Sequence, residues 1–433
     1  MNQANRLDRG LKQTVDWRLV GIYIALVFIG WINIYASVHS SEPSSIFDLS
    51  CRSGKQFIWM MTAFIIAAVI LFALNPHYWE VSALPLYLVV TALLVLVIFV
   101  SKDVKGSHSW FELGPVKFQP AELSKISTSL LLATVLSKMN RPLNRFVDVL
   151  RIAPIILLPM LIIVAESETG SALVYVGFIF VLYREGLSGW YLTLIGAAIV
   201  VFILTLISNW WISIIVCTSV AAAFLIWTFI HYRKRSKTGR RVWIRNIILS
   251  YIGAIALVFA TDFLFHNVLQ DHQRSRIEVL LGLKDDPSGV GYNVRQSMIA
   301  IGSGGLTGKG FLGGTQTAYG FVPEQSTDFI FCTVGEEWGF VGCLLVVVLY
   351  CLLIGWIIQD ADKSRESFTR IYGYCLASCL FMHLFINIGM TIGLMPVIGI
   401  PLPLLSYGGS SLWTFTAMLF IFIALNRQEN KYF

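Results

Sequence analysis

The chain has 433 residues, of which 56% are hydrophobic and only 13% are charged, and its mean hydropathy is +0.71. A soluble globular domain carries about 25% charged residues. This composition therefore excludes a soluble globular protein and predicts an all-α membrane protein that crosses the bilayer many times. The net charge of +7 comes from basic loops between spans and says little about the substrate.

The apolar stretches predict about twelve membrane-spanning helices, because a helix needs about 17–25 residues to cross about 30 Å of hydrocarbon. Residues 1–16 precede them without the cleavage site of a secretory signal, and we expect a cytoplasmic tail there. The stretches near 152–165 and 170–184 are short, which is typical of half-helices that line a cavity. The predicted spans lie near residues 17–37, 55–74, 83–100, 119–137, 152–165, 170–184, 188–208, 211–231, 246–266, 332–358, 370–394 and 407–425.

Short basic loops predict the orientation of these spans, because loops rich in Lys and Arg stay in the cytoplasm. The strongest is YRKRSKTGRRVWIR, residues 232–245, with seven Lys and Arg. This run could also be a nucleic-acid patch, but its place between two spans favours topology, and no nucleic-acid partner is expected. Both tails, 1–16 and 426–433, are then cytoplasmic, and the long loop 267–331 is extracytoplasmic. No soluble domain interrupts residues 1–433.

The first of four polar stretches is GSHSWFELGPVKFQPAELSK, residues 106–125, with the candidate substrate-binding residue Trp110 in a loop. Glu122 and Lys125 are three residues apart and so lie on one helix face. They could form a self-neutralising ion pair near the interface. Alternatively, Lys125 faces a cavity and binds an anionic group of the substrate while Glu122 orients it, since intramembrane ionisable residues are usually functional.

The second polar stretch is ESETGSALV, residues 166–173, where two acids flank a break between the two short spans. A helix that starts after Gly170 would present free N–H groups and the positive end of its dipole to a ligand. The acids could equally be helix N-cap residues.

The third polar stretch, residues 273–316, runs through a loop with glycine at eight of the nineteen positions 302–320. Glycine lets the backbone approach a ligand closely, and cationic side chains suit a phosphate-bearing ligand. The segment GKGFLG (308–313) matches GxGxxG but follows no strand and opens no βαβ unit, so nucleotide use is not supported. The candidate substrate-binding residues here are Arg274, Arg276, Gln296 and Lys309.

The fourth polar stretch is NIGMTIGLMPVIGIPLPLLSYGGSS, residues 387–411. Three prolines break the helix, and a glycine-serine cluster with the candidate substrate-binding residue Ser410 follows. Broken backbone at membrane depth is tolerated only where protein or a water-filled cavity satisfies its polar groups. Together with the break at 166–170, this stretch predicts an internal polar cavity open to the outside.

A carboxylate, Asp328, stands at the start of an apolar helix in PEQSTDFIF, residues 323–331. Because a charge at mid-bilayer costs about 2.5–3.5 kcal/mol, Asp328 either caps this helix, as Thr327 could, or takes part in chemistry. Thr327, Glu336 and Glu337 are expected to support the site. Thr261-Asp262-Phe263 repeats the local TDF without the surrounding motif, and Asp262 is interpreted as interfacial.

Taken together, these stretches resemble the SEDS family (shape, elongation, division and sporulation proteins), and a SEDS-type helical bundle is the expected fold. The GTQ at 314–316 and the PEQ at 323–325 favour its cell-elongation branch over its division branch. The matching motifs follow the family's order from residue 106 to 411: GSHSWFELGPVKFQPAELSK, IGSGGLTGKGFLGGTQ, PEQSTDFIF, GEEWGFVG and GIPLPLLSYGGSS.

The resemblance implies a peptidoglycan glycosyltransferase that polymerises lipid II at the outer face of the bacterial plasma membrane. It implies as partners a class B penicillin-binding protein transpeptidase and other membrane proteins of the elongation complex. The family's essential aspartate corresponds to Asp328, which would act as general base. Lys125, Lys309, Arg274 or Arg276 would hold the substrate diphosphate.

Three positions depart from the family pattern: Ser109 replaces an Arg, Ser326 replaces a His and Glu168 replaces an Asp. Residues 188–266 hold three spans where one is expected, which indicates an inserted helix pair that leaves Asp328 on the outside. The sequence shows no metal-ligand spacing, although Mg²⁺ or Mn²⁺ could assist the diphosphate. A lipid II flippase is the alternative function; an ion-coupled transporter would be expected to show inverted repeats, and none is evident.

Overall fold

The computed structural model describes residues 15–38, 45–101, 109–113, 116–139, 143, 146–208, 210–231, 237–267, 274–275, 277–278, 281, 283 and 290–431. The chain forms two compact units. Unit 1 contains Met1–Leu187 and Tyr292–Phe433, and unit 2 contains Ser188–Gly291.

Helices make up most of unit 1, together with one antiparallel hairpin of strands β1 (Phe111–Leu113) and β2 (Val116–Phe118), in which Phe111 lies opposite Phe118. In chain order the helices are α2 (Trp17–Val38), α3 (Arg52–Ala68) with its continuation η1 (Val69–Ala73), α4 (His77–Val100), α5 (Pro120–Met139), α6 (Phe146–Ala165), α7 (Thr169–Val174), η2 (Tyr175–Gly177), α8 (Phe178–Arg184), α13 (Val290–Ser303), α14 (Thr315–Ala318), α15 (Ile330–Lys363), α16 (Ser367–Thr391) and α17 (Gly409–Lys431).

Ten helices in the described part of the chain are long and apolar enough to cross a membrane. The remaining two predicted spans are α5, whose polar residues lower its hydropathy, and the shorter apolar segment Thr169–Arg184. The predicted class, an all-α polytopic membrane protein, is confirmed. Part of the predicted long loop 267–331 is helical (α13 and α14), and its side of the membrane stays a prediction.

One prediction about the spans is wrong. The stretch near 152–165 is not a half-helix, because α6 is a 20-residue helix with Pro154 and Pro159 inside it. Proline removes one backbone hydrogen bond but is tolerated in membrane helices, where neighbours satisfy the freed carbonyl. The adjoining segment Thr169–Arg184 is short, as predicted.

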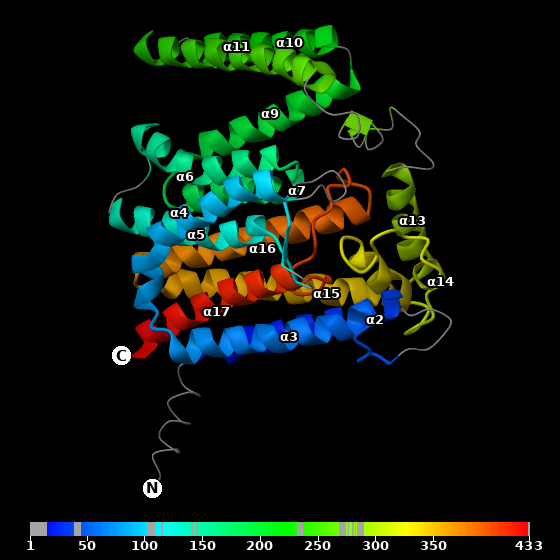
Figure 1. Cartoon of the computed structure of the whole chain (residues 1–433). Coiled ribbons are helices and arrows are strands. Elements are labelled where there is room, and N and C mark those ends of the chain that lie inside the picture. Colours follow the sequence, from blue (N-terminus) through cyan, green and yellow to red (C-terminus); the bar gives the residue numbers. More distant parts are fainter. Residues whose placement is uncertain are drawn as a thin grey trace. The chain divides into compact units, whose positions relative to one another are not determined.

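The centre of unit 1 is formed by α5 and α16, which pack against each other (Figure 1). The apolar window of α16 is 83% buried, whereas those of α3, α4 and α6 are each 28% buried. α15 lies against α16 and α2, and α17 lies against α3. The outer helices therefore leave apolar faces for lipid, while polar residues on α5 and α16 are enclosed by protein.

The predicted break in the C-terminal region is confirmed. Residues 392–408 connect α16 to α17 without regular helix. Gly393 and Gly399 have φ of +75° and +76° there, a conformation that glycine adopts without the steric penalty of a side chain. The backbone of this connection must find hydrogen-bond partners in the surrounding protein, because lipid supplies none.

Ion pairs join several helix termini at one end of unit 1. They involve the N-terminal ends of α2 and α16 and the C-terminal ends of α8 and α15. The pairs are Arg18–Asp360, Arg184–Asp362 and Arg370–Glu185. Asp328 precedes the first residue of α15 and therefore lies at the opposite end of that helix from Asp360.

Unit 2 consists mainly of three helices, α9 (Gly189–Ile207), α10 (Trp210–His231) and α11 (Lys237–Asn267). Each packs on the other two, and α10 and α11 run side by side (Figure 1). These helices coincide with the three spans predicted for 188–266. That two of them are an insertion relative to the family stays a prediction.

Candidate functional site

The Asp328 segment leads into α15 through a turn. The N-cap position of α15 is Phe329, which makes no side-chain cap bond. The hydroxyl of Thr327 instead donates backward to the backbone oxygen of Glu324 at 3.2 Å. Thr327 therefore does not cap α15, and the role of Asp328 stays a prediction.

The backbone of this segment is held by residues that are far away in the sequence. The carbonyl oxygens of 326, 327 and 328 each accept a hydrogen bond. Their donors are the Tyr407 N–H at 2.8 Å, the Ser406 hydroxyl at 2.5 Å and the Asn387 side-chain amide at 2.8 Å. Asn387 also donates to the Ile400 carbonyl at 2.7 Å. One amide thus joins the Asp328 backbone to the broken segment after α16.

The two helix breaks meet beside Asp328. A Cβ added to Gly399 would lie 3.3 Å from Asp328 Oδ2, so the carboxylate lies against the bare backbone of this glycine. A Cβ added to Gly170, at the start of α7, would meet Ile398 and Ile400. Both breaks therefore pack together in unit 1, and the candidate base lies where they come together.

A buried polar cluster lies on the other side of the same broken segment. Lys125 Nζ on α5 is 2.6 Å from Glu122 Oε1 and 2.9 Å from His383 Nε2 on α16. His383 Nδ1 lies 3.1 Å from the Pro401 carbonyl oxygen. That nitrogen is then the protonated one, so His383 Nε2 accepts from the Lys125 ammonium. Lys125 is fully buried, with 0% exposure.

The structure brings Glu122 and Lys125 together as the predicted ion pair. The role of Lys125 in substrate binding stays a prediction, because the ammonium is enclosed and already has two partners. To reach a substrate phosphate it would have to leave both of them. His383 carried no sequence signal of its own, since no other ligand-type residue stands at a diagnostic spacing from it.

Glu336, on the first turns of α15, organises the glycine-rich loop. Its buried carboxylate accepts from the Lys309 ammonium at 2.7 Å and from the backbone N–H groups of Thr315, Gln316 and Thr317 at 2.8–2.9 Å. Lys309, predicted to bind diphosphate, is thus engaged with Glu336. Glu336 thus holds this loop, and its support of the site stays a prediction.

The same loop fits into a break in α15. Gly339 has φ of +66° and interrupts the helix, and a side chain on it or on Gly308 would clash with the opposing backbone. The Phe340 N–H donates to the Gly305 carbonyl at 2.9 Å, and the Lys309 N–H donates to the Glu336 carbonyl at 3.0 Å. These bonds replace those that the helix loses, as buried backbone requires.

Gln325 connects this loop to the Asp328 turn. Its side-chain amide donates to the Thr317 carbonyl at 2.7 Å and also to the Ser37 carbonyl on α2. Thr317 is in turn held by Glu336. The position of the Asp328 turn therefore depends on Glu336 through two hydrogen-bonded steps.

Arg52, the first residue of α3, is a contact that the sequence did not predict. Its Nη1 donates to the Ser326 hydroxyl at 2.5 Å, and the guanidinium lies 5.8 Å from the centre of the Tyr407 ring. Its Nη1 also lies 3.9 Å from Glu324 Oε2, and its side chain is 46% exposed. Ser326, which stands where the family has a histidine, therefore accepts from a cation that comes from another helix.

The acids of ESETG are not N-caps by hydrogen bonding, since Glu168 occupies the N-cap position of α7 without a cap bond. Glu168 Oε1 instead accepts from the hydroxyl of Ser109 at 2.7 Å. Two departures from the family pattern thus pair with each other, beside the half-buried Trp110. Burial, and after it the nearby Glu168 carboxylate, raises the pKa of Glu166 to about 8.

The other predicted residues are spread more widely. In unit 2, Arg274 Nε lies 2.8 Å from Glu278 Oε1, and the guanidinium lies over the Phe265 ring. Arg276 lies outside the described residues. Gln296 is half-buried on α13, and Ser410 is buried in the first turn of α17. Glu337 is buried next to Glu336.

Within the described ranges, no group of three or more His, Cys, Asp or Glu is placed to hold a metal ion.

Fold and site together define a class: a helical membrane protein in which a carboxylate is held at the meeting point of two helix breaks. The family of FtsW, RodA and SpoVE, described as cell cycle proteins, matches residues 16–224 and 238–431. The chain belongs to this family, and the SEDS resemblance is confirmed.

Individual relatives agree with the elongation branch. The peptidoglycan glycosyltransferase MrdB of Escherichia coli K12 is 35% identical over 351 residues, which cover 80% of this chain and 78% of that protein. The peptidoglycan glycosyltransferase RodA of Treponema pallidum is 31% identical over 437 residues, covering 96% and 98%. A FtsW relative from Geobacter is 27% identical. The chain is accordingly a multi-pass bacterial membrane protein.

Solved structures show the same fold. A chain described with the structural coordination of polymerisation and crosslinking by a peptidoglycan synthase complex matches with a TM-score of 0.67 at 25% identity, covering 96% of this chain and 98% of that one. RodA of Thermus thermophilus matches with a TM-score of 0.59 at 24% identity, covering 96% and 97%.

Proposed function

We propose that this protein is a peptidoglycan glycosyltransferase of cell elongation, which polymerises lipid II into glycan strands. The observation that carries the proposal is the Asp328 segment: three consecutive carbonyls are fixed by Tyr407, Ser406 and Asn387, and the carboxylate rests against Gly399. A general base must be held in a defined position within reach of the proton that it takes. The type of reaction is taken from the relatives MrdB and RodA, which are named peptidoglycan glycosyltransferases.

In the proposed reaction, Asp328 takes the proton of the 4-hydroxyl of the acceptor GlcNAc. The oxygen attacks the anomeric carbon of the donor MurNAc, the new glycosidic bond forms, and the bond to the lipid diphosphate breaks. The diphosphate leaves with the electron pair. General-base assistance of this kind contributes typically about 10²–10⁴-fold in rate.

The cationic side chains that could bind the substrate diphosphate differ in how closely carboxylates already hold them. Lys125 and Lys309 are held by Glu122 and Glu336 at 2.6 and 2.7 Å, whereas Arg52 is only loosely paired, at 3.9 Å, with Glu324 and has nearly half of its side chain exposed. A guanidinium can bind phosphate oxygens in bidentate fashion. We therefore add Arg52 to the predicted set; Mg²⁺ or Mn²⁺ carried by the diphosphate stays part of the proposal.

The proposal includes sidedness and a partner. The Asp328 end of α15 would face outward, because the helix termini at its other end belong to the segments that the basic-loop pattern assigns to the cytoplasm. A class B penicillin-binding protein would crosslink the strands, which is supported by the match to a chain from a peptidoglycan synthase complex.

The direct test is polymerisation of lipid II by purified protein with its transpeptidase partner in detergent, with products resolved on a gel. We expect a ladder of glycan chains. A lipid II flippase, the less favoured alternative, would instead move lipid II across a sealed vesicle without making chains. Transport without polymerisation would overturn the proposal.

Asn387 is expected to hold Asp328 in position without touching the reacting atoms. Replacing it with alanine removes both bonds to the carbonyls of Asp328 and Ile400. Because a misplacement of about 1 Å can cost about 10²-fold in rate, we expect kcat to fall by about that factor while KM for lipid II changes little.

The matched control for this variant is Asn33→Ala. Asn33 is also buried in a helix, but within the described residues its amide donates just to the carbonyl of Ile29, one turn earlier. Its loss should leave polymerisation intact. Equal losses in both variants, or a rise in KM alone for Asn387→Ala, would show that Asn387 does not act through Asp328.

A further inference from the structure

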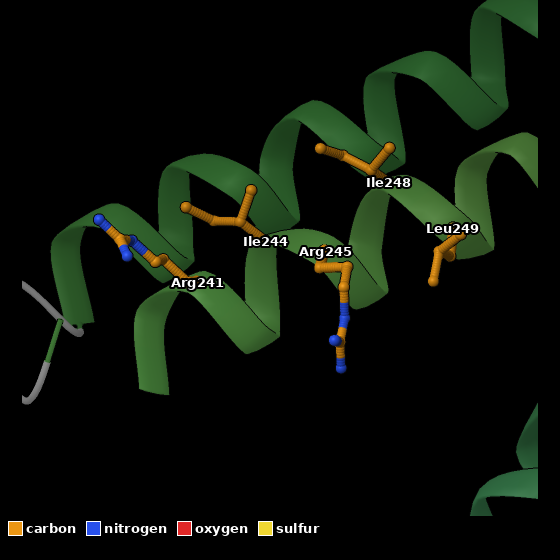
Figure 2. Close-up of a pocket in the computed structure, with 5 residues that line it drawn as sticks. All are labelled: Arg241, Ile244, Arg245, Ile248 and Leu249. Carbon is orange, nitrogen blue, oxygen red and sulfur yellow. The ribbon is translucent and has the colours of Figure 1, made fainter. Parts of the chain in front are cut away.

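A groove on unit 2 has an almost wholly apolar lining and two arginines at its margin. It is lined by five side chains of α11: Arg241, Ile244, Arg245, Ile248 and Leu249 (Figure 2). Spacings of three and four residues bring side chains to neighbouring places on a helix surface. Residues 241, 245 and 249 form one row and residues 244 and 248 form the next, so the groove lies between two adjacent ridges.

The two arginines of this groove lack acidic partners. Both are exposed, and no carboxylate in the described part of the chain pairs with either guanidinium. Like charges four residues apart on a helix repel each other. A bound anion that meets both groups would remove this repulsion.

The depth of the groove in the membrane follows from the sequence of α11. The apolar span begins at Arg241 and runs to Asn267, so the arginines stand at the edge of the hydrocarbon. Trp243 beside them lies 6.4 Å, between ring centroids, from Trp227 of α10. Tryptophan is enriched at the interface between lipid and water. The guanidinium groups therefore lie at the level of lipid headgroups.

The apolar part of the groove lies deeper. Ile248 and Leu249 are 47% and 59% exposed to the surroundings of the protein and lie about two turns further into the span than Arg241. A free phosphate ion would meet the arginines but leave these side chains uncovered. An acyl chain attached to a phosphate would cover them.

From this arrangement we infer that the groove is a binding site for an anionic phospholipid. The phosphate and the negative headgroup are held by Arg241 and Arg245, whose planar guanidinium groups suit phosphate oxygens. One acyl chain lies along Ile244, Ile248 and Leu249. The site is independent of the proposed polymerase reaction, because it uses only residues of unit 2.

The test is lipid binding to the purified full-length protein, measured by native mass spectrometry as the fraction carrying phosphatidylglycerol against lipid concentration. A basic residue near a charged surface contributes enough for roughly a five-fold change in affinity. We therefore expect Arg241→Gln with Arg245→Gln to weaken binding by about 25-fold, and the double Lys variant to keep most of it.

Three controls decide the interpretation. Lys138→Gln with Arg151→Gln removes two exposed charges near the ends of α5 and α6 and should leave this binding unchanged. Ile248→Asn should weaken binding of long-chain but not of short-chain phosphatidylglycerol. Equal losses in the control pair, equal binding of phosphatidylcholine, or displacement of the lipid by inorganic phosphate would each overturn the inference.

Discussion

Replacing Asp328 with asparagine is expected to lower the rate of glycan-chain synthesis by about 10²–10⁴-fold, because the amide cannot take the acceptor proton. The replacement keeps the side-chain size and the backbone carbonyl that Asn387 holds. The fold should therefore persist, and lipid II should still bind. The measurement is the single-turnover rate of polymerisation together with the affinity for lipid II.

The chain contains its own control for this variant. Asp262 stands in the same local sequence, Thr-Asp-Phe, but lies on α11 of unit 2. Its Oδ1 is 3.5 Å from His266 Nε2. Asp262→Asn should polymerise at the native rate. A native rate in Asp328→Asn, or an equal loss in Asp262→Asn, would contradict the role of Asp328 as base.

Replacing Glu336 with glutamine is expected to destabilise the protein by about 3 kcal/mol and to reduce activity as well. Removing one member of a buried ion pair costs about 3–5 kcal/mol, and the lower end applies because Lys309 is 26% exposed. The glutamine NH₂ group would also face backbone N–H groups that now donate to the carboxylate. The measurement is thermal unfolding in detergent, followed by polymerisation below the transition.

Glu337 is the matched control, since it is the adjacent residue and equally buried. Its Oε2 has no hydrogen-bond partner in the part of the chain that the structure describes. Glu337→Gln should therefore cost far less than Glu336→Gln. The opposite ranking would mean that the hydrogen bonds drawn to Glu336 do not hold the glycine-rich loop.

Much of the fold follows from local sequence. Apolar runs identified the spans, and the prolines of 396–403 identified the break after α16, because both effects act within a few residues. The same reasoning failed for α6: the apolar stretch near 152–165 suggested a short segment, but the helix begins at Phe146 and tolerates Pro154 and Pro159 inside it. The length of an apolar run therefore does not by itself fix where a helix begins.

The site was predictable only in part. Asp328 and Glu336 carried motif signals, and Glu122 and Lys125 carried a helix-spacing signal. The contacts of Asn387 with Asp328 and of His383 with Lys125 join residues 59 and 258 positions apart. No local pattern reports such pairs. Arg52 was missed for the same reason, since its partner Ser326 lies 274 positions away.

The break at Gly339 divides α15 into two helical segments, residues 330–338 and 340–363. Residues 330–338 are fastened to the glycine-rich loop by Glu336 and by the backbone bonds on either side of the break. The remainder of the helix, up to Lys363, spans the bilayer. Membrane helices tilt to match bilayer thickness. Because backbone bonds on both sides of Gly339 fasten both parts to the same loop, a change in tilt of the longer part would be passed to that loop and, through Gln325, to the Asp328 turn.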